Sequence, residues 1–299
     1  MAEDIVVLGI DLGGTNIRFG TVNAAGKLSN FHREPVDRTL SGDQLVEWIA
    51  QRVEASCSIA RMRAVAVGLA GMVTPSQIMK PAHVVLPGLG NYPLARSLSR
   101  RLHKPCWLGN DASAALRGEV HYGAAQGCCN VLLLTLGTGI GGGLLLDGKL
   151  REGTHGSSAE IGLMMLGYPG QGDPVTVESV YSPGAVMKRL NASNGQLFEK
   201  VRQGDALARQ LVDEMSESIG LLIADIHLLL DLELVLISGG LAAAGEPLLI
   251  GLRQGFERAC PFDYQFGLKI EMGALPGEKA GVIGAASVWF EHDGLLPSL

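Results

Sequence analysis

Gly109-Asn110-Asp111-Ala112-Ser113-Ala114-Ala115 joins the short apolar segment Cys106-Trp107-Leu108 to an alanine-rich segment. This pattern predicts a buried strand that turns directly into a helix, with Asp111 at the junction. The free backbone N–H groups at the start of a helix favour the ionised form of a carboxylate, and the end of a strand holds it in place. Asp111 is therefore a candidate for chemistry. Because Asp is also a preferred N-cap residue, a purely structural capping role is the alternative.

Two glycine-rich turns favour the chemical interpretation. Asp11-Leu12-Gly13-Gly14-Thr15-Asn16 follows the apolar run at 5–10, and Leu136-Gly137-Thr138-Gly139-Ile140-Gly141-Gly142-Gly143 follows the apolar run at 131–135. Each pattern predicts a strand, a tight turn and a second strand. Glycines in such turns let backbone N–H groups approach phosphate oxygens, and Thr15 and Thr138 can each add a hydroxyl donor. A carboxylate base together with two phosphate-binding turns indicates phosphoryl transfer.

The composition is that of a compact chain that acts on small molecules. Its 299 residues suffice for one large or two medium domains, of which we prefer two, and 47% apolar residues with 41 glycines indicate a dense core and many tight turns. The net charge of −6, without a basic cluster, argues against a nucleic acid or an anionic membrane surface as the main partner.

The sequence favours a reducing, cytoplasmic location. The acidic start Met1-Ala2-Glu3-Asp4 leads directly into a predicted strand and lacks the features of a secretory signal. The two most apolar regions are interrupted by glycines or by charged residues, which argues against a membrane span. The cysteines at 57, 106, 128, 129 and 260 form no CxxC pair and no metal-ligand spacing, as expected of small apolar residues.

The periodicity of apolar residues and the turn signals outline an α/β chain. They predict strands at 5–11, 16–23, 27–32, 64–69, 106–108, 234–237 and near 268–272, a hairpin over 130–149, and helices over about 42–56, 93–102, 112–123, 205–230 and 280–286. Residues 74–92 predict a long loop or a short hairpin. Gly71 and Ser238-Gly239-Gly240 follow buried strands, where the missing side chains leave room for a ligand or simply for a turn.

Jointly, the three glycine turns and Gly109-Asn110-Asp111-Ala112 resemble motifs of the sugar kinases of the ROK family, within the actin-like ATPase and hexokinase superfamily. The resemblance covers nearly the whole chain. It implies an α/β, two-domain actin-like ATPase (ribonuclease H-like) fold with an active-site cleft between the domains. We expect a first domain at 1–122 and a second at 123–299, with the last helix a candidate to pack back on the first domain.

The resemblance also implies a site. Asp111 would be the general base that accepts a proton from a sugar hydroxyl, ATP the phosphoryl donor, and Asp11 the residue that orients Mg²⁺ through water. ATP would be bound by the phosphate motifs and by the adenosine motif that ends in Gly239-Gly240, which comprise Asp11, Gly13, Gly14, Thr15, Asn16, Gly137, Thr138, Gly139, Gly239 and Gly240. The sugar would meet Gly71, Asn110, Asp111, Glu160 and Glu178. A homodimer is the expected assembly.

One region departs from the family pattern. Many relatives have Gly-Glu-x-Gly-His followed by a cysteine-rich zinc loop, whereas this chain has Ala159-Glu160-Ile161-Gly162-Leu163 and then Thr176-Val177-Glu178. We therefore expect no zinc site. Leu163 replaces a histidine that meets the sugar in relatives, and His155 is too far back to substitute for it. We expect the apolar run Leu163-Met164-Met165-Leu166 to bury against its domain and, with a turn at Gly167-Tyr168-Pro169-Gly170, to hold Glu178.

The function implied is ATP-dependent phosphorylation of a hexose or N-acetylhexosamine. The identity of the sugar, the hydroxyl that is phosphorylated, and ATP or polyphosphate as the donor stay open. A transcriptional repressor of the same family would need a DNA-binding helix-turn-helix, and only ten residues precede Asp11. A catalytically silent sugar sensor is the alternative suggested by the lost histidine and zinc loop.

Overall fold

The apolar run Val6–Leu12 forms β1, the central strand of a five-stranded sheet. It pairs antiparallel with β2 (Asn16–Asn23) and parallel with β4 (Met62–Leu69). β3 (Leu28–Pro35) and β5 (Cys106–Asn110) complete the strand order β3-β2-β1-β4-β5. The computed structural model describes residues 5–74, 76–79, 86–167, 174–192 and 196–299. It confirms the predicted strands of this segment.

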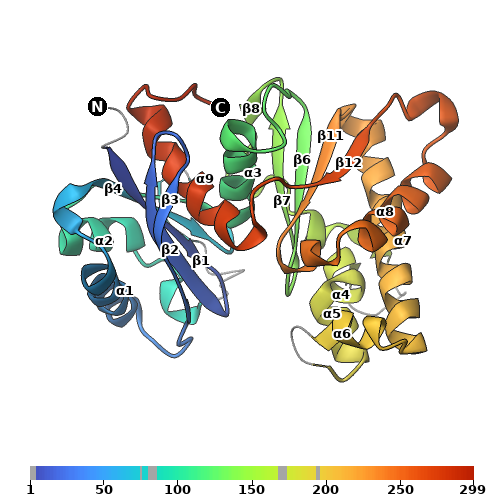
Figure 1. Ribbon diagram of the computed structural model, residues 1–299, viewed down its shortest axis with the longest axis horizontal. Helices are drawn as coiled ribbons and strands as arrows, with labels where there is room; N and C mark the ends of the chain where they lie inside the picture. Colours follow the sequence, from blue (N-terminus) through green and yellow to red (C-terminus); the bar gives the residue numbers. More distant parts are fainter. Residues whose placement is uncertain (1–4, 75, 80–85, 168–173, 193–195) are drawn as a thin grey trace. The chain divides into compact units, whose positions relative to one another are not determined.

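The two faces of this sheet pack against different helices. Because alternate residues of a strand point to opposite faces, Leu8, Ile10 and Leu12 of β1 enter one core with α1 (Gly42–Ser56) and α2 (Leu94–Leu102). Val7 enters a second core on the other face, to which α9 (Gly277–His292) contributes Val282, Ile283, Ala285, Ala286 and Phe290. Figure 1 shows α9 and the pair α1 and α2 on opposite sides of β1 and β4.

The helix after β5, α3 (Asp111–Tyr122), lies against α9 at very close range. A Cβ atom added at Gly284 would lie 1.6 Å from the carbonyl oxygen of Ala114. Only glycine fits at this crossing, so the small residues of the last helix have a packing reason. At the other end of the pair, Glu291 of α9 accepts a hydrogen bond from Arg117 and forms another with His121, both of α3.

The chain forms two compact units, each made of discontinuous segments. Residues 1–127, 143–158 and 274–299 make up the first unit, and residues 128–142 and 159–273 the second. The division expected from the sequence, at 122 and 123, put 143–158 in the second domain and left the last helix a candidate to pack back on the first. The structure groups both segments with the first unit, and β1 and β4 supply the apolar face that α9 covers. The colours of Figure 1 show this return of the chain's end to the strands of its beginning.

A second five-stranded sheet has the order β12-β11-β6-β7-β8. β11 (Leu234–Ser238) pairs parallel with both β6 (Val131–Leu136) and β12 (Lys269–Met272). β7 (Ile140–Leu146) begins in the second unit and continues past Gly142 into the first, where it pairs with β8 (Lys149–Leu150). The predicted hairpin and the predicted strands at 234–237 and near 268–272 are confirmed.

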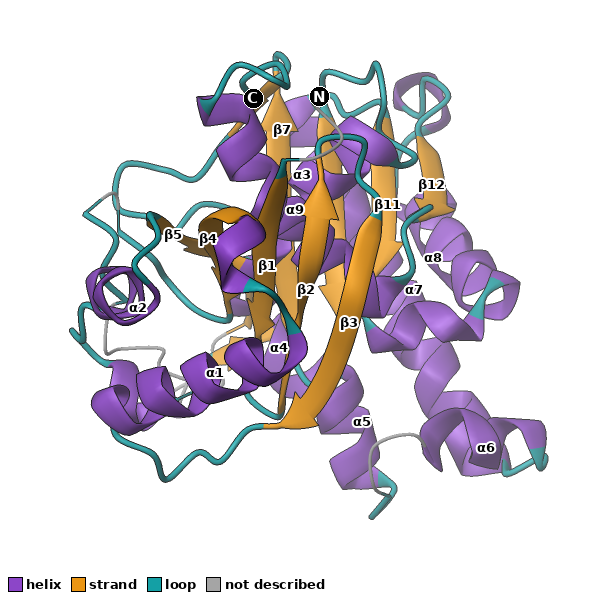
Figure 2. Cartoon of the chain, turned by 60° about the vertical axis from the view of Figure 1, so that its left-hand side comes forward, coloured by secondary structure: helices purple, strands orange, loops and turns teal. Residues whose placement is uncertain are grey.

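Two long helices cover the second sheet, as Figure 2 also shows. α7 (Ala206–Leu230) and α8 (Glu246–Ala259) approach so closely that a Cβ atom at Gly220 or Gly255 would lie 2.2 or 2.1 Å from a backbone oxygen of the other helix. The shorter elements of this unit are β9 (Met165–Gly167), β10 (Val175–Thr176), α4 (Val177–Tyr181), α5 (Pro183–Arg189) and α6 (Gln196–Arg202). Across the described ranges, no helix has both the length and the apolar character needed to span a bilayer.

Candidate active site

Three parallel strands of the first unit end at one edge of their sheet and carry candidate residues there. In the register, Asp11 of β1 lies opposite Gly68 of β4, and Gly68 lies opposite Gly109 of β5. The residues that follow these positions therefore share the edge. Asn110 at the end of β5 confirms this proximity, because its Nδ2 donates to the carbonyl oxygen of Gly71, 3.2 Å away.

Asn110, and not Asp111, is the N-cap of α3. Asn110 Oδ1 accepts hydrogen bonds from the backbone nitrogens of Ala112 and Ser113 at 2.9 and 3.0 Å. Asp111 is the first residue of the helix, and its Oδ1 accepts from the nitrogen of Ala112 at 2.9 Å. The capping role that was the alternative for Asp111 thus belongs to its neighbour. Both polar atoms of the Asn110 side chain, Nδ2 and Oδ1, therefore form hydrogen bonds within the protein.

The Asp11 carboxylate is paired with a cation that the sequence analysis did not single out. Arg18 lies directly opposite Asp11 in the β1–β2 register, and its Nη1 donates to Asp11 Oδ2 at 2.9 Å. Burial raises the pKa of Asp11, and the charge and hydrogen bond of Arg18 oppose that rise. Gly281 of α9 packs directly against the Asp11 side chain, since a Cβ atom at Gly281 would lie 3.1 Å from Asp11 Cγ.

The register could have revealed Arg18 from the sequence. In a hairpin whose turn occupies residues 13–16, the pairing of positions 12 and 17 requires that 11 and 18 also face each other. The approach of Gly281 leaves no comparable signal, because it depends on how the last helix returns to the sheet.

The turn between β1 and β2 leaves its centre open. The backbone nitrogen of Gly13 donates to the oxygen of Asn16 at 3.0 Å, which closes the turn, and the oxygen of Thr15 accepts from Val36 at 2.9 Å. Gly14 lies between them, and Thr15 itself is exposed. The turn is therefore fixed at its base while a hydroxyl remains accessible, as a phosphate-binding turn requires.

The second unit brings two more glycine turns together. Thr135 of β6 lies opposite Ser238 of β11, so both strands deliver their glycines to the same edge. Gly239, with φ 87°, lies against the backbone of Leu136, where a Cβ atom would be 2.7 Å from the Leu136 oxygen. Gly240 has open space around its Cα atom. The predicted adenosine motif and the second phosphate motif are thus neighbours.

The turn of the second phosphate motif is closed by its own backbone and by a glutamate. The nitrogen of Gly137 donates to the oxygen of Gly139 at 3.1 Å, and the exposed Thr138 accepts at its backbone oxygen from Gly184 of α5, also at 3.1 Å. Glu178 Oε2 accepts from the nitrogen of Ile140 at 2.7 Å. Glu178, predicted to meet the sugar, therefore contacts the predicted phosphate turn.

Glu160 is half-buried and precedes a short 3-10 helix at Ile161–Leu163. The preceding residue, Ala159, has a left-handed φ of 60°, a conformation that favours glycine, and the sequence differs from the family pattern at this residue. Gly162, two residues after Glu160, packs against Glu178: a Cβ atom there would lie 3.1 Å from Glu178 Oε2.

The expected burial of the apolar run Leu163–Leu166 is wrong. These four side chains are 38 to 47% exposed. Glu178 is instead held by the N-terminal end of α4: Thr176 and Ser179 form a capping box, and the nitrogen of the buried Val177 donates to the oxygen of Met164 at 2.9 Å. The predicted turn at Gly167–Gly170 extends into residues 168–173, which lie outside the described residues.

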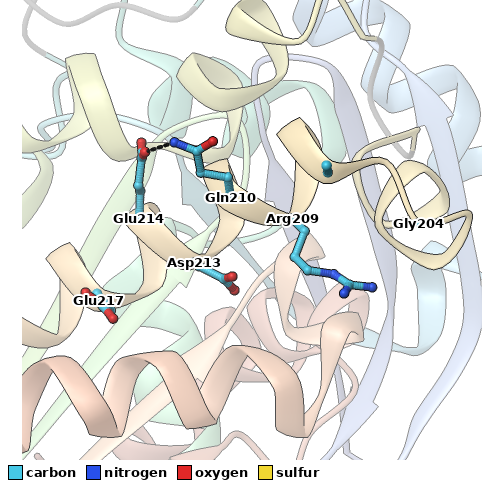
Figure 3. Close-up of a pocket in the computed structure, with 7 residues that line it drawn as sticks. Gly204, Arg209, Gln210, Asp213, Glu214 and Glu217 are labelled. Carbon is cyan, nitrogen blue, oxygen red and sulfur yellow. Dashed lines mark hydrogen bonds between the residues drawn. The ribbon is translucent and has the colours of Figure 1, made fainter.

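A hollow on the second unit lies away from these turns. It follows α7 and is lined by Gly204, Ala206, Arg209, Gln210, Asp213, Glu214 and Glu217. Figure 3 shows that these side chains are largely charged or polar, and Gln210 donates to Glu214 at 2.8 Å within the same helix. None of the sequence-predicted site residues lines it.

The structure thus groups the predicted residues into two sets. The first unit holds Asp11, the turn at 13–16, Gly71, Asn110 and Asp111, and the second holds Gly137, Thr138, Gly139, Glu160, Glu178, Gly239 and Gly240. Among the described residues, no group of three or more His, Cys, Asp or Glu side chains is placed to hold a metal ion.

The chain is similar in sequence and fold to known proteins. A glucokinase of Thermotoga maritima is 30% identical over 317 residues, which covers 96% of this chain and 98% of the relative. An N-acetylmannosamine kinase of Escherichia coli is 28% identical over 250 residues, covering 80% and 84% of the two chains. A crystal structure of a ROK family glucokinase from Streptomyces griseus, in complex with glucose and AMPPNP, matches with a TM-score of 0.81 and 28% identity over 95% of this chain and 98% of that one.

The last comparison also establishes the fold. The two sheets with their helices correspond to the actin-like ATPase fold of ROK sugar kinases, as the motifs had implied. The sequence profile of the ROK family matches residues 7–292, from β1 to the end of α9. Since that match spans both units and every motif described above, the chain belongs to the ROK family.

Proposed function

We propose that this protein transfers the γ-phosphoryl group of ATP to a hydroxyl group of a hexose or N-acetylhexosamine, with Asp111 as the general base. The observation that carries the proposal is the position of Asp111 at the N-terminus of α3, on the sheet edge that also carries Asp11 and the first phosphate turn. The relatives named glucokinase and N-acetylmannosamine kinase support a sugar as the acceptor.

The residues of the first unit suit proton transfer. In this mechanism the Asp111 carboxylate accepts the proton of the attacking hydroxyl as its oxygen forms the new bond to phosphorus and the bond to the leaving ADP breaks. The hydrogen bond from the nitrogen of Ala112 fixes one carboxylate oxygen. Asn110 caps the first turn of α3 and so fixes the backbone that carries Asp111. The base is therefore positioned by the start of the helix.

Asp11 suits the handling of Mg²⁺ that accompanies ATP. Its partly buried carboxylate is oriented by Arg18 through Oδ2, and no further ligand cluster is found among the described residues. A single protein carboxylate is sufficient for an ion that is bound chiefly by phosphates and water. When bound, the ion neutralises charge on the phosphates. The turns at 13–16 and 137–139 would bind the phosphate oxygens through backbone N–H groups and through Thr15 and Thr138.

An assay of ADP release tests the proposal. The purified protein with Mg²⁺ and ATP should turn over at least one member of a panel of hexoses and N-acetylhexosamines, and polyphosphate in place of ATP should give little or no turnover. Glucose and N-acetylmannosamine belong in the panel. Turnover with polyphosphate alone would change the donor, whereas sugar binding without any turnover would favour the catalytically silent sensor.

A further inference from the structure

We propose that Glu178 is a positioning residue for the second phosphate turn, so that one carboxylate serves both the sugar and the nucleotide. The inference rests on the proposed function for its two ligands and adds a link between their binding sites. Its basis is the contact between Glu178 and the backbone of the turn at 137–140.

The carboxylate is wedged into the turn. Glu178 Oε2 lies 2.7 Å from the nitrogen of Ile140, and Ile140 is buried. A Cβ atom at Gly139 would lie 2.2 Å from the same oxygen, and one at Gly162 would lie 3.1 Å from it. The two glycines therefore leave the space that the carboxylate occupies. A longer side chain at either glycine would expel it.

This contact fixes the backbone that we expect to meet phosphate. A hydrogen bond from a backbone N–H to a charged oxygen is roughly twice as strong as one to a neutral acceptor. Without Glu178, the buried nitrogen of Ile140 would lose its acceptor, and the neighbouring Thr138 and Gly139 would lose the group that holds their end of the turn. The other end stays tied by the bond between Gly137 and Gly139.

Glu178 is itself held firmly enough to act as a support. The capping box of Thr176 and Ser179 starts α4, and the nitrogen of Ser182 donates to the backbone oxygen of Glu178 at 3.2 Å. Oε2 is the oxygen that bonds to the turn. In this proposal, Oε1 meets a sugar hydroxyl while Oε2 stays on Ile140.

The shared carboxylate couples the two ligands. A sugar hydroxyl bonded to Oε1 would restrain the carboxylate and, through it, the turn at 137–140. Bound sugar would therefore raise the affinity for nucleotide, because the turn would already be ordered. Coupling between two sites is reciprocal, so bound nucleotide would raise the affinity for sugar by the same factor. The contact with Ile140 also means that the turn shares in placing the carboxylate.

Two substitutions separate the roles of Glu178. Glu178→Gln keeps an oxygen that can accept from Ile140, whereas Glu178→Ala removes it. We expect the affinity for AMPPNP with Mg²⁺, measured by calorimetry without sugar, to stay within about threefold of wild type in Glu178→Gln. In Glu178→Ala it should fall by roughly 5- to 100-fold. Both variants should lose sugar affinity. Gly139→Ala, which displaces the carboxylate from the other side, should also weaken nucleotide binding.

Controls and a second readout make the result decisive. Glu214→Ala, which removes a half-buried glutamate of α7, should leave both affinities unchanged. Hydrogen exchange of the Ile140 amide, measured without ligands, should be about tenfold faster or more in Glu178→Ala and near wild type in Glu178→Gln. Unchanged nucleotide affinity and unchanged exchange in Glu178→Ala would overturn the inference. If wild type binds no nucleotide at all, the proposed function fails, and the exchange measurement still decides whether Glu178 supports the turn.

Discussion

At the scale of single residues, Asp111 is the position where capping and chemistry can be told apart. Since Asn110 already caps α3, Asp111→Asn should leave the fold and sugar binding almost intact. It should lower kcat by a factor of about 10² to 10⁴, because the amide is nearly isosteric but cannot accept the proton. Steady-state rates at saturating ATP and sugar check this. An unchanged kcat would remove Asp111 from the mechanism.

Asp11 gives a prediction for pH. Burial raises its pKa above the ordinary 3.8, although Arg18 opposes the rise. The folded chain therefore binds this proton more tightly than the unfolded chain does. The contribution of Asp11 to the free energy of unfolding is greatest below the ordinary pKa and falls as the pH rises through the folded pKa.

Asp11→Asn lacks this titration, so its stability relative to wild type should improve as the pH rises. Urea unfolding of both proteins from pH ~3.5 to ~7, without ligands, measures the difference in unfolding free energy. A difference that stays constant would show that the pairing with Arg18 cancels the effect of burial on the pKa of Asp11, and a difference that moves the other way would show that the pairing outweighs it.

At the scale of elements, the packing of α3 against α9 fixes the position of Asp111, because Asp111 is the first residue of α3. Gly284→Ala would push a methyl group into the backbone of Ala114. We expect a loss of about 1–3 kcal/mol or more in the free energy of unfolding, and a lower kcat, because α3 carries the base. Urea unfolding and kinetics measure both.

Gly109→Ala is the matched control for this substitution. It makes the same change in the same unit, but its Cβ atom would meet nothing within 4 Å. It should therefore be neutral or slightly stabilising. Equal stability of Gly284→Ala and wild type would mean that the helices are farther apart than they lie here.

The segment around α4 gives a prediction about metal. In its described residues, the support for Glu178 comes from the capping box of Thr176 and from the bond to Ile140. We predict no stoichiometric zinc in the purified protein, loss of activity with EDTA, and full recovery with Mg²⁺ alone. Elemental analysis and add-back assays test this. One tightly bound zinc per chain would mean that Cys128, Cys129 or His155 had been misjudged.

Most elements could be predicted from the sequence, because the periods of 2.0 and 3.6 residues are local properties. The strand-to-helix junction at Asp111 and the glycine turns were identified in this way. Contacts made through backbone atoms could not be predicted, because every residue except proline has the same backbone N–H group. The sequence therefore does not show that the nitrogen of Ile140 bonds to Glu178. The apolar run Leu163–Leu166 shows a further limit: apolar character favours burial, but it does not say whether a surface is there to bury against.

At the scale of the whole molecule, the two sets of candidate residues belong to different units. If one sugar engages both Asp111 and Glu178, its binding must restrain the units relative to each other. We therefore predict that a sugar that is turned over lowers the radius of gyration, as in kinases that exclude water before transfer. Small-angle scattering with and without sugar measures this. A non-substrate sugar is the control, and an unchanged value would contradict the prediction.

The return of α9 to the first sheet affects how the chain is made. The strands β1 to β5 leave the ribosome before the segment that covers one of their faces, and at usual rates of synthesis the gap between Asn110 and Gly277 takes roughly 10 to 30 s. The second unit ends at residue 273, so all of it is translated before α9. The nascent chain therefore carries an apolar sheet face that α3 covers only in part until α9 emerges, and we expect chaperones to bind it during that interval.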